Sequence, residues 1–143
     1  MPARDRYHQQ LRTALEKDGW TITHDHLPMK LGKKDMYVDL GAEQLFAAEK
    51  GQSRIAVELK SFLGQSDMTE LERAMGQYVI CSKVMTDFDP GRELYLAVDR
   101  EVYEELFEEP IGQLLLKDGL RLIVFNLNSA EILQWKPKKP SEI

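Results

Sequence analysis

The chain has one cysteine, Cys81, and three histidines among its 143 residues. A single cysteine cannot form an internal disulfide, and this scarcity is typical of the reducing cytoplasm, where we expect the protein to be. It also excludes a zinc site built from several cysteines. His24 and His26 form a pair with the spacing of metal ligands, but the sequence offers no third ligand beside them, so we do not expect a zinc centre.

Long apolar runs are missing as well. No stretch approaches the roughly 20 residues that a membrane-spanning helix needs, and the polar N-terminus between Arg4 and Gln10 does not resemble a signal peptide. We therefore expect no membrane partner.

An excess of positive charge is also absent, since the formal net charge is −5. This argues against a protein that binds nucleic acid through bulk charge alone. It does not exclude a nuclease, because bound cations neutralise acidic metal ligands. Two lysine clusters could contact phosphates or could be ordinary solvated surface: Lys30, Lys33 and Lys34, and Lys136, Lys138 and Lys139.

The hydrophobic share of 43% and the charged share of 30% are those of an ordinary globular protein. We expect one domain over residues 1–136 and a flexible tail over 137–143. The hydrophobic patterns predict helices over 4–18, 67–85, 99–108 and 110–116, and strands over 20–24, 36–50, 54–62, 92–98, 120–127 and 131–135. The third helix would be capped by Asp99, and the second would begin with Asp67 and Glu70 in capping-box spacing. The order α-β-β-β-α-β, followed by further helices and strands, predicts an α/β fold with a mixed sheet flanked by helices.

The segment Arg54–Ser61 carries the most chemical information. It reads as a strand in which Glu58 and Lys60 lie on one face and apolar residues on the other, because strand side chains alternate. An acid and an amine on one face can form part of a catalytic site. The alternative is a solvated sheet face.

The preceding strand could bring a second carboxylate to this pair. If Gly51–Gln52 is a two-residue turn, Glu43 lies opposite Lys60 and joins Glu58 on one face. The other face then collects Phe46, Ala48, Ile55, Val57 and Leu59, with Gln44 as its one polar member. A one-residue slip would put Glu43 and Glu49 in the core, and burying unpaired charges is costly, so we favour the first register.

Asp39 is a competing second acid. It shares the parity of Glu43 but lies about 13 Å farther along a straight strand, at roughly 3.3 Å per residue. A bend or bulge at Gly41 would bring it in. Geometry alone prefers Glu43.

Converging carboxylates and a lysine suit hydrolysis of phosphodiesters. One or two Mg²⁺ ions can activate the water and stabilise both the phosphate and the leaving oxygen, and Mg²⁺ needs only one or two protein carboxylates. Gln77, on the following helix, could hold a phosphate or a metal-bound water, or could be an ordinary exposed glutamine. Gly76 beside it suggests close packing, since a glycine inside a helix costs about 1 kcal/mol.

These residues resemble a known pattern. Asp39, the Glu58-Leu59-Lys60 triplet and the helix with Gly76-Gln77-Tyr78 resemble the PD-(D/E)XK nuclease superfamily, although Val38 stands where that pattern has proline. Over about residues 2–136 the chain is similar to the fdxN-element excision controlling factor family, XisH. The segments that carry this resemblance are Asp18–Asp25, Tyr37–Glu43, Ala47–Gly51, Ile55–Phe62, Glu93–Val98 and Glu108–Leu115.

The resemblance implies a restriction-endonuclease-like core and a role in excising a DNA element in cyanobacteria, beside a site-specific recombinase and a partner factor, XisI. The superfamily pattern implies Asp39 and Glu58 as ligands of Mg²⁺ or Mn²⁺ and Lys60 as the catalytic amine, with Glu43 as competitor or third ligand. DNA would be the substrate, and a homodimer would suit cleavage of two strands. The alternatives are a regulator without catalysis that binds XisI or the recombinase, and a small protein-binding α/β domain.

Overall fold

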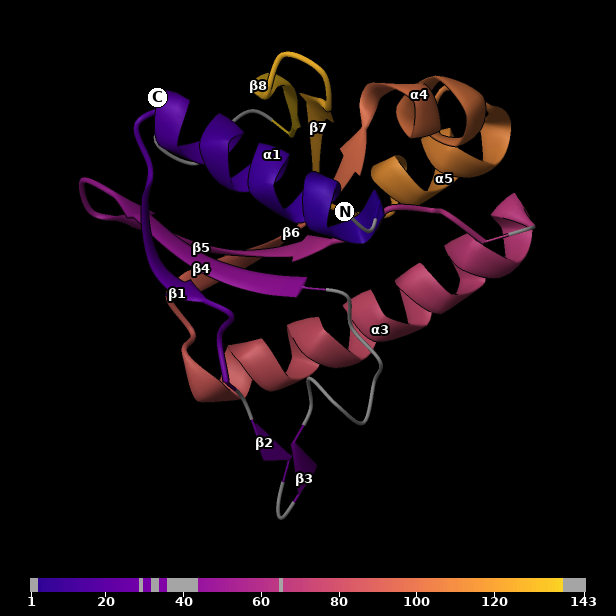
Figure 1. Cartoon of the computed structure of the whole chain (residues 1–143). Coiled ribbons are helices and arrows are strands. Elements are labelled where there is room, and N and C mark those ends of the chain that lie inside the picture. Colours follow the sequence, from indigo (N-terminus) through magenta and orange to yellow (C-terminus); the bar gives the residue numbers. More distant parts are fainter. Residues whose placement is uncertain (1–2, 29, 32–33, 36–43, 65, 138–143) are drawn as a thin grey trace.

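The computed structural model describes residues 3–28, 30–31, 34–35, 44–64 and 66–137 (Figure 1). The first half contains α1 (Ala3–Lys17), β1 (Thr21–Asp25), β2 (Lys30–Leu31), β3 (Lys34–Asp35), β4 (Gln44–Lys50), β5 (Ser53–Leu59) and α3 (Asp67–Phe88). The second half contains β6 (Arg92–Asp99), α4 (Arg100–Val102), the π-helical turn η1 (Tyr103–Phe107), α5 (Pro110–Lys117), β7 (Leu122–Asn126) and β8 (Glu131–Lys136).

Six strands form one mixed sheet in the order β1-β4-β5-β6-β7-β8. The neighbours β5, β6 and β7 are parallel, and the outer pairs are antiparallel. Parallel strands need a crossover connection, which α3 provides between β5 and β6. This arrangement confirms the predicted α/β class and the mixed sheet flanked by helices. Among the described residues, β2 and β3 pair with each other and not with the six-stranded sheet.

Helices cover both faces of the sheet, with α1 on one side and α3 on the other (Figure 1). The core on the α1 side includes Leu11, Leu15, Phe46, Val57 and Tyr95. The core on the α3 side includes Ala56, Leu71, Tyr78, Leu96 and Phe107. Because β5 contributes to both cores, it is a central strand buried on both sides.

Two details of the predicted helices differ from the structure, although both helices begin where they were expected. The N-cap of α3 is Ser66, whose hydroxyl accepts a hydrogen bond from the Thr69 N–H at 3.3 Å, so Asp67 and Glu70 do not form the expected capping box. Asp99 does cap the next helix, accepting from the Glu101 N–H at 3.3 Å. That helix is short, however, and continues as η1, in which the Glu108 N–H bonds to the Tyr103 carbonyl.

Some predictions fall outside the described residues. These are the first part of the strand expected over 36–50 and residues 138–143 of the expected tail. None of the helices within the described ranges combines the length and apolar character needed to cross a bilayer.

Candidate functional site at the carboxyl end of β5

Glu58 and Lys60 lie at the carboxyl end of β5 and are almost fully buried. Their exposed fractions are 1% and 6%. Lys60 follows the last residue of β5, and its N–H still bonds to the Ala97 carbonyl of β6 at 3.2 Å, so the alternation of side chains reaches it. The predicted acid and amine therefore share one face of the strand. The alternative of a solvated sheet face is wrong.

The side chain of Glu58 faces α3. Burial and, in smaller part, the negative charge of Glu58 together raise the pKa of the Cys81 thiol to about 12. The pKa of the Tyr78 hydroxyl is raised as well, first by burial and in smaller part by Glu58. A carboxylate that acts on two neighbouring turns of α3 must lie between the sheet and that helix, where few water molecules screen its charge.

The predicted pairing of β4 with β5 is confirmed as far as it is described. Leu45 lies opposite Glu58, Ala48 lies opposite Ile55, and Lys50 and Ser53 flank the two-residue turn. The two proposed partner acids, Asp39 and Glu43, lie outside the described residues, so the choice between them stays open.

Two further buried polar residues lie between the end of β5 and the first turn of α3. Ser61 follows Lys60 and is 2% exposed, and Glu70 in the first turn of α3 is 5% exposed. Glu70 accepts a hydrogen bond from the Gly64 N–H at 3.0 Å and so ties the connecting segment to the helix. The sequence pattern had suggested only a capping role for Glu70. Its position one turn before the buried Ala74 would have indicated that it faces the sheet.

Gln77 and Gly76 have different surroundings. Gln77 is half-buried on α3, directly before Tyr78, whereas Gly76 is exposed. A methyl group added at Gly76 would meet nothing within 4 Å among the described residues, so the expected close packing is not found there. The role of Gln77 stays a prediction.

Tyr78 locks α3 to the sheet. Its hydroxyl donates to the Leu94 carbonyl at 3.1 Å and accepts from the Arg121 N–H at 3.2 Å. One side chain thus joins the helix that covers Glu58 to β6 and to the start of β7.

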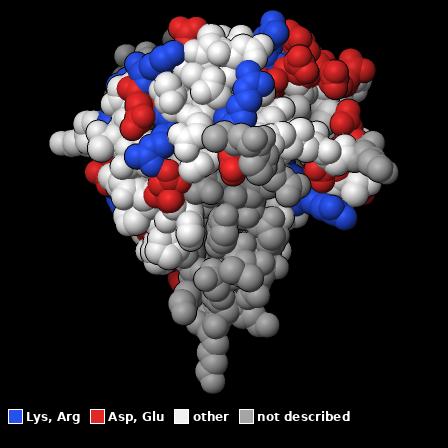
Figure 2. Space-filling view, in the orientation of Figure 1, with Lys and Arg blue, Asp and Glu red and all other residues white. Residues whose placement is uncertain are grey.

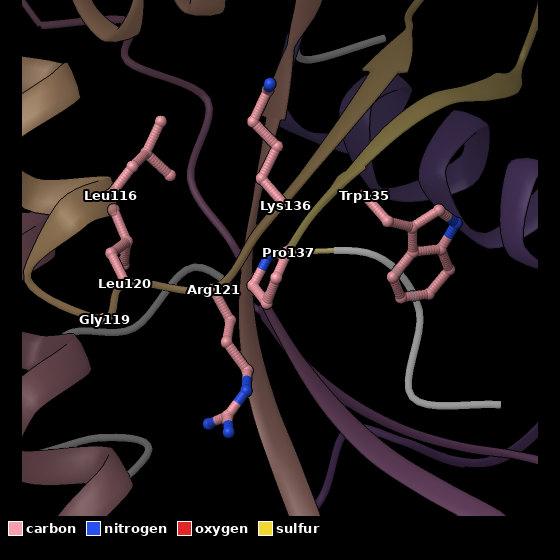
Figure 3. Close-up of a pocket in the computed structure, with 7 residues that line it drawn as sticks. All are labelled: Leu116, Gly119, Leu120, Arg121, Trp135, Lys136 and Pro137. Atoms are coloured by element: carbon pink, nitrogen blue, oxygen red, sulfur yellow. The ribbon is translucent and has the colours of Figure 1, made fainter. Parts of the chain in front are cut away.

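A separate hollow of about 520 Å³ opens at the edge of the sheet that β8 forms (Figure 3). Its lining residues are Leu116, Gly119, Leu120, Arg121, Trp135, Lys136 and Pro137. The cationic ends of Arg121 and Lys136 point in opposite directions (Figure 3). Arg121 lies 2.9 Å from Glu93, and the Lys136 ammonium lies 5.8 Å from the centre of the Tyr103 ring. The hollow therefore lacks converging groups and does not include the acid–lysine pair.

Within the described ranges, no group of three or more His, Cys, Asp or Glu side chains could hold a metal ion. Glu58 is the one predicted ligand that these ranges include. A buried carboxylate beside a lysine still fits one side of a Mg²⁺ site, since this ion uses few protein ligands and keeps several waters.

Fold and site together define an α/β protein with a mixed six-stranded sheet whose central strand ends in a buried acid–lysine pair. The family model described as XisH protein matches residues 1–133. The chain belongs to the XisH family, as its sequence had suggested.

Two solved structures are closely similar. An XisH family protein from Nostoc punctiforme PCC 73102 is 33% identical, with a TM-score of 0.83 over 92% of this chain and 99% of that one. An fdxN element excision controlling factor protein from Anabaena variabilis is 34% identical, with a TM-score of 0.82 over 92% of this chain and 98% of that one. No curated protein sequence matches this chain significantly.

Proposed function

We propose that this protein is a Mg²⁺- or Mn²⁺-dependent phosphodiesterase that acts on DNA in the excision of a DNA element. The observation that carries this proposal is the placing of Glu58 and Lys60 on one face of β5, both nearly inaccessible to solvent. Burying two charged side chains side by side in a central strand is costly, and such a cost is typical of a functional site.

Each residue would have a distinct role. Glu58, with Asp39 or Glu43, would hold the metal ion, which when bound supplies an activated water and stabilises charge on the phosphate. Lys60 would orient or deprotonate the water and neutralise the charge that develops on the phosphate oxygens. Gln77 would hold a phosphate oxygen or a water at the α3 side. The described order of α1, the strands to β5, α3 and β6 supports the PD-(D/E)XK pattern as the scaffold.

A second candidate function is regulation without catalysis, through binding of an XisI-like protein or a site-specific recombinase. One face favours a protein partner over DNA, because acidic side chains gather near α4 and α5 (Figure 2). Exposed acids in this region are Glu101, Glu104, Glu105, Glu108 and Glu109. A phosphate backbone would be repelled there, whereas a basic protein surface would be attracted. The Anabaena relative is described as a controlling factor, which agrees with this role. In either role we infer a cytoplasmic protein.

Cleavage assays with matched variants separate the two functions. Purified protein is incubated with supercoiled, linear and branched DNA, with Mg²⁺ or Mn²⁺, alone and with an XisI-like protein. We expect metal-dependent cleavage by the wild type and none by Glu58→Gln or Lys60→Ala. Glu131→Gln, which removes an exposed acid of β8 away from α3, is the control and should cleave normally.

Folding and metal binding are measured on the same samples. Thermal melting shows that each variant is folded, and calorimetric titration with Mn²⁺ should show binding that Glu58→Gln loses. Absence of both cleavage and metal binding in the wild type, with and without the XisI-like protein, would overturn the catalytic proposal and leave the regulatory one.

A further inference from the structure

The outer face of α3 has an apolar centre. The helix forms the outer layer on its side of the sheet (Figure 1) and buries the residues that face inward, among them Ala74, Tyr78 and Cys81. On the opposite side Val79 and Ile80 remain 49% and 42% exposed, next to the exposed Gly76. Helix periodicity puts these three residues on one stripe.

Opposite charges flank this centre. Glu72 lies on the stripe before Gly76, and Lys83 lies after Ile80, about three helical turns from Glu72. Both are exposed, and neither forms an ion pair with another residue in the described part of the chain. Two other charges lie near the stripe: Arg73 is 3.9 Å from Glu70, and the exposed Asp87 lies one turn beyond Lys83, outside the span from Glu72 to Lys83.

These residues are arranged symmetrically along the helix. The midpoint between Glu72 and Lys83 falls between Gln77 and Tyr78, and so does the midpoint between Gly76 and Val79. If two copies of α3 packed antiparallel around this midpoint, Glu72 of each copy would face Lys83 of the other. In the same register Val79 of each copy would face the open space above Gly76 of the other. The pairing of opposite charges and the fit of Val79 over Gly76 thus each favour the same register of the two helices.

We propose that the outer face of α3 binds the same face of a second copy of this chain, with the two helices antiparallel. A two-fold interface must be self-complementary in this way, since one patch meets itself. The proposal gives a reason for Gly76, whose helix-weakening effect has no packing reason within the described residues. It does not depend on catalysis, because Glu58 and Lys60 lie on the other side of α3.

The test reverses the charge at Glu72 or Lys83 in separate variants and then mixes the two variants. Sedimentation equilibrium over a range of concentrations should show a reversible wild-type dimer. Glu72→Lys should raise its dissociation constant by about tenfold or more, because two attractive pairs become repulsive, and Lys83→Glu should do the same. An equimolar mixture of these two variants should dimerise again, since each copy then offers the other the opposite charge at both positions. Glu101→Lys, a reversal in α4 away from this face, is the control and should dimerise like the wild type.

A shape variant tests the second observation. Gly76→Ile fills the open space without changing charge and should also weaken the dimer about tenfold, while thermal melting shows that the monomer is folded. A wild type that stays monomeric at every concentration would overturn the proposal. So would a dimer that tolerates Glu72→Lys and Gly76→Ile, or a mixture of the two charge variants that fails to associate.

Discussion

At the scale of single residues, the buried carboxylate of Glu58 contributes to the electrostatics of the α3 side. A carboxylate with 1% exposure keeps its influence over several ångströms, because little water screens it. The charge of Glu58 acts on two neighbouring groups, Cys81 and Tyr78. Their pKa values are raised by burial and, in smaller part, by this charge. Since Cys81 is the only cysteine, it can report on Glu58 directly.

Glu58→Gln should lower the pKa of the Cys81 thiol, because the variant removes a negative charge that opposes formation of the thiolate. The pKa should stay above its ordinary value, since burial, the larger cause, remains. The measurement is the chemical shift of the Cys81 Cβ, followed by NMR as a function of pH in cysteine-labelled protein. Glu72→Gln, on the outer face of α3, should leave the titration unchanged, and an equal change in both variants would contradict a local effect of Glu58.

Tyr78→Phe should lower the free energy of unfolding by about 1–3 kcal/mol, because it leaves a buried carbonyl and a part-buried N–H without their partner. The unfolding midpoint in urea measures this loss. Tyr103→Phe is the control, since its ring is also buried but its hydroxyl forms no hydrogen bond with another described residue. An equal loss in both variants would show that the bonds of the Tyr78 hydroxyl contribute little.

At the scale of elements, the two glycines within α3 and α5 have opposite surroundings. A Cβ at Gly112 would lie 2.1 Å from the Phe107 Cα and 2.5 Å from the Leu106 carbonyl oxygen, both backbone atoms that cannot move aside cheaply. A Cβ at Gly76 would meet nothing within 4 Å among the described residues. The first glycine allows α5 to approach η1, and the second leaves space on the surface.

Gly112→Ala should therefore destabilise the protein by about 2 kcal/mol or more, because it overpacks a contact with the backbone. Gly76→Ala should stabilise the dilute, monomeric protein by about 0.5–1 kcal/mol, because alanine is the better helix former. Urea unfolding of both variants provides the comparison. Equal effects of the two substitutions would contradict the difference in packing.

The sequence predicted elements well where hydrophobic alternation and a turn agreed. The register of β4 against β5 followed from the Gly51–Gln52 turn and from the apolar parity of Phe46 and Val57, and the structure has that register. The N-cap was predicted wrongly because Asp67 and Ser66 are both good caps, and only the backbone conformation distinguishes them. The π-turn over Tyr103–Phe107 packs closely against α5 at Gly112, and hydrophobic periodicity alone does not distinguish a π-turn from an α-helix.

The candidate site was predictable in part, because it too depends on the alternation of side chains along a strand. Alternation alone put Glu58 and Lys60 on one face, but it could not show that α3 covers that face, because this depends on where the crossover helix packs. A predicted solvated surface and a predicted catalytic pair look alike in the sequence. The observed burial excludes the solvated surface, and the catalytic role stays a prediction.

At the scale of the whole molecule, burial makes stability depend on alkaline pH. The Cys81 thiol has a folded pKa of about 12 and an ordinary value of 9.0, so above about pH 9 unfolding releases a proton. The free energy of unfolding should then fall by about 1.4 kcal/mol per pH unit from this group. Tyr78 and Tyr95, whose pKa values are also raised by burial, add to the fall at higher pH.

Cys81→Ala should reduce this pH dependence, although the variant loses packing at every pH. The measurement is the urea unfolding free energy at several pH values from neutral to alkaline, compared as slopes. Identical slopes for wild type and variant would show that the thiol ionises alike in the folded and unfolded chains.

The position of β5 in the middle of the sheet protects its amides from hydrogen exchange. Its amides bond to β4 on one side and β6 on the other, and both of its faces are covered, so no local opening exposes them to solvent. These amides should exchange with deuterium only when the whole domain unfolds. Any ligand that binds the folded chain makes such unfolding rarer by an amount set by its concentration and affinity. The strand that carries Glu58 can therefore reveal binding of a metal ion, DNA or a protein partner, whichever surface each of them occupies.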